Sequence, residues 1–195
     1  MQHADRVTEE AYLAFDDANE GKHWFVNGQI YAMAGGTPRH SAICNNVGRA
    51  LGNLVAKRPC IVFQSDLRVH VRETGLYDYP DVTVVCGPPE RHAKDRNTII
   101  NPTLIVEVLS PGTENDDRGA KATHYRRLAS LKEYLLVSST EERVEHYRRL
   151  DDGKWLLTEV EGRGSSIELP VLDGTLSLAD IYDKTELLGE DPPSE

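Results

Sequence analysis

The segment that most constrains the fold is an apolar run interrupted by a single acid. Residues 104–109 read Leu-Ile-Val-Glu-Val-Leu. Because the run is apolar on both sides, it predicts a strand buried on both faces of a sheet, with helices covering each face. An ionised carboxylate is costly to bury in such a strand unless a partner neutralises it. Glu107 therefore marks both a central strand and a candidate functional site.

A second apolar strand carries an acid in a similar setting. Asp81 opens the run Asp-Val-Thr-Val-Val-Cys at residues 81–86. Two buried carboxylates near each other repel and raise one pKa, unless a cation lies between them. Taken alone, either acid can be a solvated or hydrogen-bonded residue at a strand end. Taken as a pair, Asp81 and Glu107 favour a shared divalent metal ion.

Helix and strand patterns alternate through the rest of the chain. Apolar spacing predicts helices at residues 7–18, 38–56 with Thr37 as N-cap, 114–128 opened by a capping box of Thr113 and Asp116, and 178–182. Strand patterns and turn residues predict strands at 23–26 and 29–33 around Asn27-Gly28, then at 60–71, 79–86, 104–109, 134–137, 143–148, 155–160 and 167–169, with a loop at 90–101. This order predicts an α/β (α+β) fold in which helices flank a mixed central β-sheet, with extra C-terminal strands. We expect one domain over residues 1–195, with a core at about 8–183 and a polar tail at 184–195.

Composition and charge narrow the function classes. The chain has 195 residues, 39% hydrophobic and 28% charged, which is typical of one soluble globular domain. It has no apolar run of the ~20 residues that a membrane helix needs, and the segment from Met1 to Arg6 has no signal-peptide core, so we expect a cytoplasmic protein. A net charge of −10 argues against a protein that coats nucleic acid nonspecifically. It still allows a nuclease in which acids surround a metal ion and a local basic patch meets phosphate.

The cysteines and histidines give no metal-binding spacing. Cys44, Cys60 and Cys86 form no CxxC pair, so buried reduced thiols are expected rather than a disulfide or a zinc site. The seven histidines include neither HxH nor HExxH, so we do not expect a structural zinc site.

An ordered set of motifs resembles a known family. The segments are Tyr-Pro-Asp-Val at 79–82, Ile-Val-Glu-Val-Leu-Ser-Pro at 105–111 and Asp-Arg-Gly-Ala-Lys at 117–121, followed by residues 124–127 and 133–137 and preceded by 27–33. Over about residues 8–183 the chain resembles the Uma-type restriction-endonuclease-like proteins of the PD-(D/E)XK phosphodiesterase superfamily. The resemblance implies a restriction-endonuclease-like fold and Mg²⁺-dependent cleavage of nucleic acid, expected to be DNA, with Mn²⁺ as a substitute. It also implies a homodimer and products with a 5′-phosphate and a 3′-hydroxyl.

The resemblance also implies roles for individual residues. Asp81, Glu107 and the backbone carbonyl of Val108 are expected to hold the metal ion. The superfamily lysine lies two residues after the acid, where this chain has Leu109, so the catalytic amine is expected from Lys121 on the following helix. The alternative for Lys121 is an ion pair with Asp117 on a solvated helix face.

Further residues are accessory candidates. His40, Asp66 and Tyr125 are possible additions to the site, and Arg126 and Arg127 are candidate nucleic-acid contacts. For His40 a local helix-end hydrogen bond, for Asp66 a surface position, and for the arginines a solvated face are the alternatives.

One departure from the family pattern keeps other functions open. Trp24 stands where relatives carry a glutamate before the hairpin turn. This favours a nuclease-fold binding or regulatory module with weakened catalysis. The acidity of the chain favours a third possibility, a metal-dependent hydrolase of a small substrate.

Overall fold

The fold is built on a mixed six-stranded sheet. A computed structural model describes residues 6–33 and 35–188. The strand order in this sheet is β11-β10-β9-β8-β6-β3, with β8 parallel to β9 and the other neighbours antiparallel. The bounds are β3 Cys60–Gln64, β6 Val82–Cys86, β8 Leu104–Leu109, β9 Glu133–Ser138, β10 Arg143–Arg149 and β11 Trp155–Glu161. The predicted mixed central sheet is therefore confirmed, and every residue of β8 is buried.

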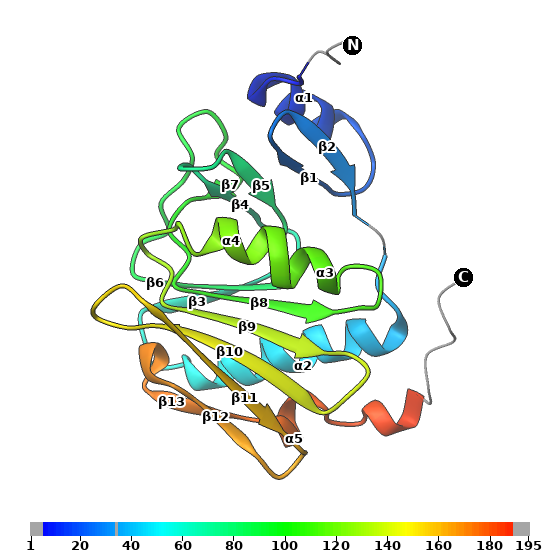
Figure 1. The fold of residues 1–195 in the computed structure, drawn as a ribbon, viewed down its shortest axis with the longest axis vertical. Helices are drawn as coiled ribbons and strands as arrows, with labels where there is room; N and C mark the ends of the chain where they lie inside the picture. Colours follow the sequence, from blue (N-terminus) through cyan, green and yellow to red (C-terminus); the bar gives the residue numbers. More distant parts are fainter. Residues whose placement is uncertain (1–5, 34, 189–195) are drawn as a thin grey trace.

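Helices cover the two faces of this sheet, as the apolar run of β8 requires (Figure 1). Val106 and Val108 point into a core with helix α2 (Pro38–Leu54), whose N-cap Thr37 accepts from the backbone N–H of His40 as predicted. Ile105 and Leu109 point into a second core with α4 (Ala122–Tyr125). Glu107 lies two residues from Ile105 and two from Leu109 on the strand, so its side chain lies on the same α4 face as theirs.

A five-stranded sheet packs beside the central one. Its order is β2-β1-β5-β4-β7, with bounds β1 His23–Val26, β2 Gln29–Ala32, β4 Arg68–Val71, β5 Leu76–Asp78 and β7 Thr98–Ile99. Helix α1 (Glu9–Ala18) precedes it in the chain. Asn27 and Gly28 both have positive φ, which confirms the predicted hairpin turn.

Two predicted strands are wrong because the chain passes from one sheet to the other inside them. The extended segment 60–71 divides into β3 and β4, with a turn in which the Leu67 N–H donates to the Gln64 carbonyl. The segment 79–86 contains only β6, because Tyr79, Pro80 and Asp81 form the link from β5. The predicted loop at 90–101 is interrupted by β7.

The helix predicted at 114–128 is also different in detail. It consists of α3 (Glu114–Asp116), a π-helical turn η1 (Asp117–Lys121) and α4. The capping box is wrong, because the Thr113 hydroxyl lies 3.1 Å from the Ser110 hydroxyl and caps no helix N–H. A π-turn inside a helix is rare and often marks a functional site.

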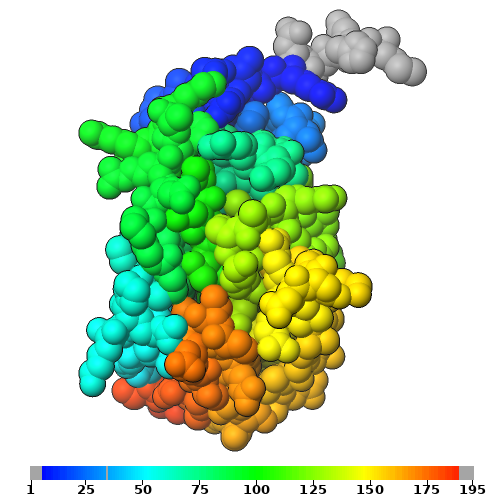
Figure 2. Space-filling view, turned by 90° about the vertical axis from the view of Figure 1, so that its left-hand side faces the viewer, coloured from blue at the N-terminus to red at the C-terminus, as the bar shows by residue number. Residues whose placement is uncertain are grey.

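The C-terminal elements close the lower end of the molecule. The extra strands form a hairpin of β12 (Ser166–Leu169) and β13 (Gly174–Ser177), joined by the 3₁₀ turn η2 (Pro170–Leu172) and followed by α5 (Leu178–Ile181). The 3₁₀ helix η3 (Thr185–Leu188) falls within the predicted tail, yet Thr185 is buried and its carbonyl accepts from Arg39. The start of that tail is therefore wrong, and residues 189–195 lie outside the described part. Figure 2 shows these elements at the end of the molecule opposite α1.

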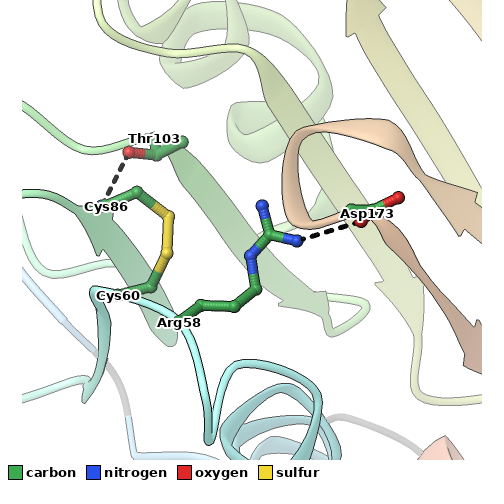
Figure 3. Close-up of a disulfide and its surroundings, with 5 residues drawn as sticks. All are labelled: Arg58, Cys60, Cys86, Thr103 and Asp173. Carbon is green, nitrogen blue, oxygen red and sulfur yellow. Dashed lines mark hydrogen bonds and ion pairs between the residues drawn. A yellow bond between two sulfur atoms is a disulfide. The ribbon is translucent and has the colours of Figure 1, made fainter.

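The prediction of reduced cysteines is wrong for two of the three. Cys60 and Cys86 are cross-strand partners on β3 and β6 and form a disulfide, while Cys44 is a free thiol (Figure 3). The strand ladder brings these two residues together although they are 26 positions apart. Beside the disulfide, the Thr103 hydroxyl accepts from the Cys86 N–H.

None of the helices in the described ranges is both long and apolar enough to cross a bilayer.

Candidate acidic active site

Asp81 and Glu107 meet because of the register between β6 and β8. Val82 pairs with Val106 in the antiparallel ladder, so the next residues along, Asp81 and Glu107, stand opposite each other. The Asp81 N–H donates to Glu107 Oε2 at 3.2 Å, and Asp81 Oδ2 accepts from the Val108 N–H at 2.8 Å. Both carboxylates line one cavity of about 220 Å³.

Lys121 reaches the same place from the π-turn. Its Nζ lies 3.0 Å from Asp78 Oδ2, 3.1 Å from Asp117 Oδ1 and 3.8 Å from Glu107 Oε1, and only 6% of the residue is exposed. The lysine therefore both points over Glu107 and forms the i,i+4 ion pair with Asp117. Asp117 and Lys121 are both buried, so this ion pair does not lie on a solvated helix face.

Tyr125 contacts two acids of the cluster through its hydroxyl. Its hydroxyl lies 2.8 Å from Asp78 Oδ2 and 3.0 Å from Glu107 Oε1, within hydrogen-bonding distance of both. The residue is fully buried, and burial raises the pKa of its phenol. Tyr125 therefore stays protonated, and its single O–H donates to one of the two acids at a time.

The site holds more acids than one lysine can neutralise. Burial raises the pKa of Glu107 well above its ordinary value, since the opposing effect of Lys121 is offset by the charges of Asp117, Asp78 and Asp81. Burial likewise raises the pKa of Asp117, against the attraction of Lys121. Burial alone would lower the pKa of Lys121, but the three neighbouring carboxylates outweigh it and raise that pKa. The lysine is therefore charged, and the raised pKa of Glu107 reflects its burial among other acids.

His40 and Cys44 extend the cluster on the side of α2. His40 Nε2 lies 3.4 Å from Asp81 Oδ2, and its Nδ1 lies 3.5 Å from the Cys44 thiol. Burial would lower the pKa of His40, but hydrogen bonds with Asp81 and the Val108 backbone raise it. One ligand atom each from His40, Cys44 and Asp81 lies within 4.8 Å of the other two. His40 therefore faces the cavity as well as beginning the helix.

Backbone and aromatic residues shape the mouth of the cavity. Trp24 lines it and stacks on Tyr31 with ring centroids 4.1 Å apart. Gly36 also lines it, and a Cβ at that position would lie only 2.5 Å from His40 Nδ1. A glycine at residue 36 thus leaves room for the imidazole beside Asp81.

Three sequence candidates lie elsewhere. Asp66 is exposed and pairs with Lys22 at 2.8 Å, so it is a surface residue and not an additional acid of the cavity. Arg126 and Arg127 do not line the cavity among the described residues, and Arg126 lies 6.0 Å from the ring centre of Tyr147. The structure therefore does not bring these arginines to the acidic cluster.

Asp78 was not among the residues predicted from the sequence, and Asp117 was predicted only as a solvent-exposed partner of Lys121. Asp78 is completely buried at the end of β5, between Tyr77 and Tyr79. An acid within that aromatic stretch, three residues before Asp81, is the signal that could have identified it. Asp117 appeared only as a surface partner of Lys121, because the π-turn that buries both side chains has no sequence signature we recognise.

The chain is similar to known proteins in sequence and in fold. The model of the Uma2 family, described as "Putative restriction endonuclease", matches residues 9–180. Two uncharacterized Synechocystis proteins are similar in sequence. Slr1290 is 37% identical over 91% of this chain and 92% of its own length, and sll1609 is 35% identical over 83% and 92%. A crystal structure of a protein from Anabaena variabilis, described as a putative nuclease belonging to DUF820, has the same fold with a TM-score of 0.76, at 19% identity over 92% of this chain and 99% of that one.

Proposed function

Because the chain belongs to the Uma2 family of restriction-endonuclease-like proteins, we propose that it is a metal-dependent endonuclease that hydrolyses phosphodiester bonds in nucleic acid, with DNA as the substrate. The observation that carries the proposal is the acidic cavity itself. Asp78, Glu107 and Asp117 surround Lys121, the Asp81 N–H donates to Glu107, and the family supplies the reaction class.

The donor set fits a divalent cation. Burial, together with the charges of Asp117, Asp78 and Asp81, raises the pKa of Glu107, and a hard cation at this point would favour its ionised form. Such a cation prefers carboxylate and carbonyl oxygens. In this proposal Asp81, Glu107 and the Val108 carbonyl hold Mg²⁺, with Mn²⁺ as a substitute. When bound, the ion would activate water and neutralise a phosphate oxygen. His40 beside Asp81 adds an imidazole, a ligand that Mn²⁺ accepts more readily than Mg²⁺.

The protein side chains have separate tasks in this proposal. Lys121 supplies the positive charge that the transition state needs, from a position where Asp78 and Asp117 fix its amine. Tyr125 holds Glu107 in place through its hydroxyl. Leu109 contributes no charge, since it packs in the core on the α4 face.

A small phosphoester is the second candidate substrate. The cavity is about 220 Å³, and its lining contains Lys121 and His40 but no arginine among the described residues. Such a lining offers little basic surface for a long phosphate backbone. A chain that cleaves small phosphodiesters but leaves DNA intact would support this candidate.

The assembly and the location are also proposals. Nucleases of this superfamily cut two strands with two sites, so we propose a homodimer, which light scattering at several protein concentrations tests. We propose the cytoplasm as the location. Because disulfides are rare in that compartment, the state of Cys60 and Cys86 in cells, measured by thiol labelling, tests it.

The test of the function is plasmid cleavage with Mg²⁺ or Mn²⁺. We expect nicking by the unmodified chain, loss of at least a hundredfold in Glu107→Gln and Asp81→Asn, and no loss in Asp66→Asn, which removes an exposed acid outside the cavity. Lys121→Ala should lower the rate more than the affinity for DNA, because its charge acts in the transition state. Adding Leu109→Lys to Lys121→Ala should restore part of that rate if the amine can act from either position.

Two results would contradict the proposal in different ways. If the unmodified chain binds DNA without cleaving it under either metal ion, the weakened binding module suggested by Trp24 is favoured. If Glu107→Gln cleaves as fast as the unmodified chain, the assignment of the active site is wrong.

A further inference from the structure

A second cluster of metal-ligand side chains lies at the five-stranded sheet. Glu9 comes from the first turn of α1, His70 from β4, and His92 from the loop between β6 and β7. One ligand atom from each residue lies within 4.8 Å of the other two. All three line a cavity of about 490 Å³, which shares no lining residue with the acidic cavity within the described ranges. The cluster is thus separate from the proposed nuclease site.

The hydrogen bond of His70 prepares one of its nitrogens for a metal ion. His70 Nδ1 lies 3.0 Å from the Leu76 carbonyl, and a carbonyl can only accept, so Nδ1 carries the proton. The lone pair of the neutral ring is then on Nε2. Metal-binding histidines commonly donate their other ring nitrogen to a carbonyl in this way, which fixes the tautomer and the ring orientation.

His92 and Glu9 already have the separation of two ligands on one ion. His92 Nε2 lies 3.4 Å from Glu9 Oε1. Two ligands at about 2.0–2.1 Å from a tetrahedral zinc ion are about 3.4 Å apart. The ring centroids of His70 and His92 are 4.7 Å apart in an edge-to-face arrangement, so the two imidazoles are neighbours.

Tyr77 holds two of the three side chains in place. Its hydroxyl donates to Glu9 Oε1, and its ring stacks on His70 with centroids 4.1 Å apart. These contacts keep the Glu9 carboxylate beside the two imidazoles.

The nearby lysine does not block the cluster. Lys94 Nζ lies 3.5 Å from Glu9 Oε2 but only 2.6 Å from Glu10 Oε1, and its side chain is 54% exposed. Its closer partner is thus Glu10, which leaves Glu9 able to bind an ion.

We propose that Glu9, His70 and His92 form a binding site for a divalent transition-metal ion of the zinc class. Two imidazoles and one carboxylate suit Zn²⁺ better than Mg²⁺, which prefers oxygen ligands. With three protein ligands, such an ion would keep a fourth position for water or a substrate group. Because the ligands come from α1, β4 and a loop, the ion would clamp the N-terminal helix to the sheet. These three residues are distant in the chain, so no short zinc-binding motif contains them.

The test is direct measurement of bound Zn²⁺ by equilibrium dialysis, on the full chain. His92→Asn removes a half-buried loop histidine, and His124→Asn removes a half-buried histidine from α4 as the matched control. We expect His92→Asn to bind one Zn²⁺ per chain fewer than His124→Asn. Asp81→Asn reports any ion held by the acidic cavity, whose His40, Cys44 and Asp81 can also bind Zn²⁺. We expect the Asp81→Asn variant to retain the Zn²⁺ ion that His92→Asn loses.

Two further readouts keep the proposal falsifiable. Co²⁺ in place of Zn²⁺ should give the visible absorption of a tetrahedral nitrogen and oxygen site in the unmodified chain, and should lose it in His92→Asn. Zn²⁺ at a hundredfold excess over its Kd should raise the Tm by about 5–10 °C. If His92→Asn does not fold, Glu9→Gln replaces it, because that side chain is 31% exposed. Equal Zn²⁺ content in the control and in the folded ligand variant would overturn the proposal.

Discussion

Replacing Lys121 with methionine removes the only lysine from the acidic cluster while keeping most of the side-chain volume. Lys121 forms ion pairs with Asp78 and Asp117, and Glu107 Oε1 lies 3.8 Å from its amine. All three acids are at most 3% exposed, so water cannot replace the lost charge. The substitution therefore leaves buried carboxylates without a counter-charge, which is the costly way to break a buried ion pair.

The expected magnitude follows from that burial. Removing one partner of a buried pair costs about 3–5 kcal/mol of unfolding free energy. For a domain of this size, each kcal/mol shifts the Tm by about 2–4 °C, so Lys121→Met should lower the Tm by about 6–20 °C in the absence of metal. Lys154→Met is the matched control, because that lysine also has a partner at 2.6 Å but is 79% exposed. We expect little change for the control, since solvent screens its ion pair.

The loss should depend on pH in a defined direction. Burial raises the folded-state pKa of Glu107 and Asp117, and Lys121 opposes that rise. A carboxyl with a raised folded pKa binds more protons folded than unfolded, so stability falls as the pH rises through that pKa. Without the lysine both pKa values rise further. The deficit of Lys121→Met should therefore be larger at about pH 8 than at about pH 5.

Urea unfolding followed by circular dichroism measures both effects, with EDTA present. A loss below about 1 kcal/mol at pH 8 would refute the reasoning, since it would mean that the cluster is already hydrated or protonated. A deficit that grows as the pH falls would refute the assigned sign. Adding Mg²⁺ should return part of the stability, because a bound cation replaces the missing charge.

Two other predictions concern the disulfide and the cavity. Reducing the Cys60–Cys86 disulfide, which spans 26 positions, should cost about 3 kcal/mol by freeing the unfolded chain, and equal urea midpoints with and without reductant would contradict this. Gly36→Ala places a Cβ 2.5 Å from His40 Nδ1 and should lower metal-dependent cleavage about tenfold or more by displacing the imidazole from Asp81. Gly35→Ala is its control, because a Cβ there meets nothing within 4 Å, and equal cleavage by both variants would show that the position of the ring is unimportant.

The central strands could be predicted because a doubly buried strand has a direct sequence signature. The apolar residues of β8 predict that the strand is buried, and burial makes an ionised Glu107 energetically costly. The β1–β2 hairpin has an equally local cause, since Asn27 and Gly28 tolerate positive φ. In both cases the physical determinant lies within a few neighbouring residues.

The parts that were not predicted depend on contacts between distant segments. The chain leaves one sheet for the other between β3 and β4, and again between β5 and β6, and both stretches read as continuous extended chain. The cross-strand pairing of Cys60 with Cys86 follows from the register of β3 on β6, which sequence spacing does not reveal. The cluster of Glu9, His70 and His92 has the same origin, because its three ligands come from separate elements.

The role proposed for Lys121 takes the positive charge from the π-turn instead of from strand β8, where the superfamily lysine lies. Leu109 and Glu107 are two residues apart on β8, so their side chains lie on the same face, and a lysine at 109 would point to the α4 side as Glu107 does. In this chain that position packs in the apolar core. The π-turn Asp117–Lys121 faces the same side of the sheet and places an amine 3.8 Å from Glu107 Oε1. The proposed reaction needs a positive charge at that point in space, and in this proposal the sheet face, rather than the sequence position, determines which residue supplies it.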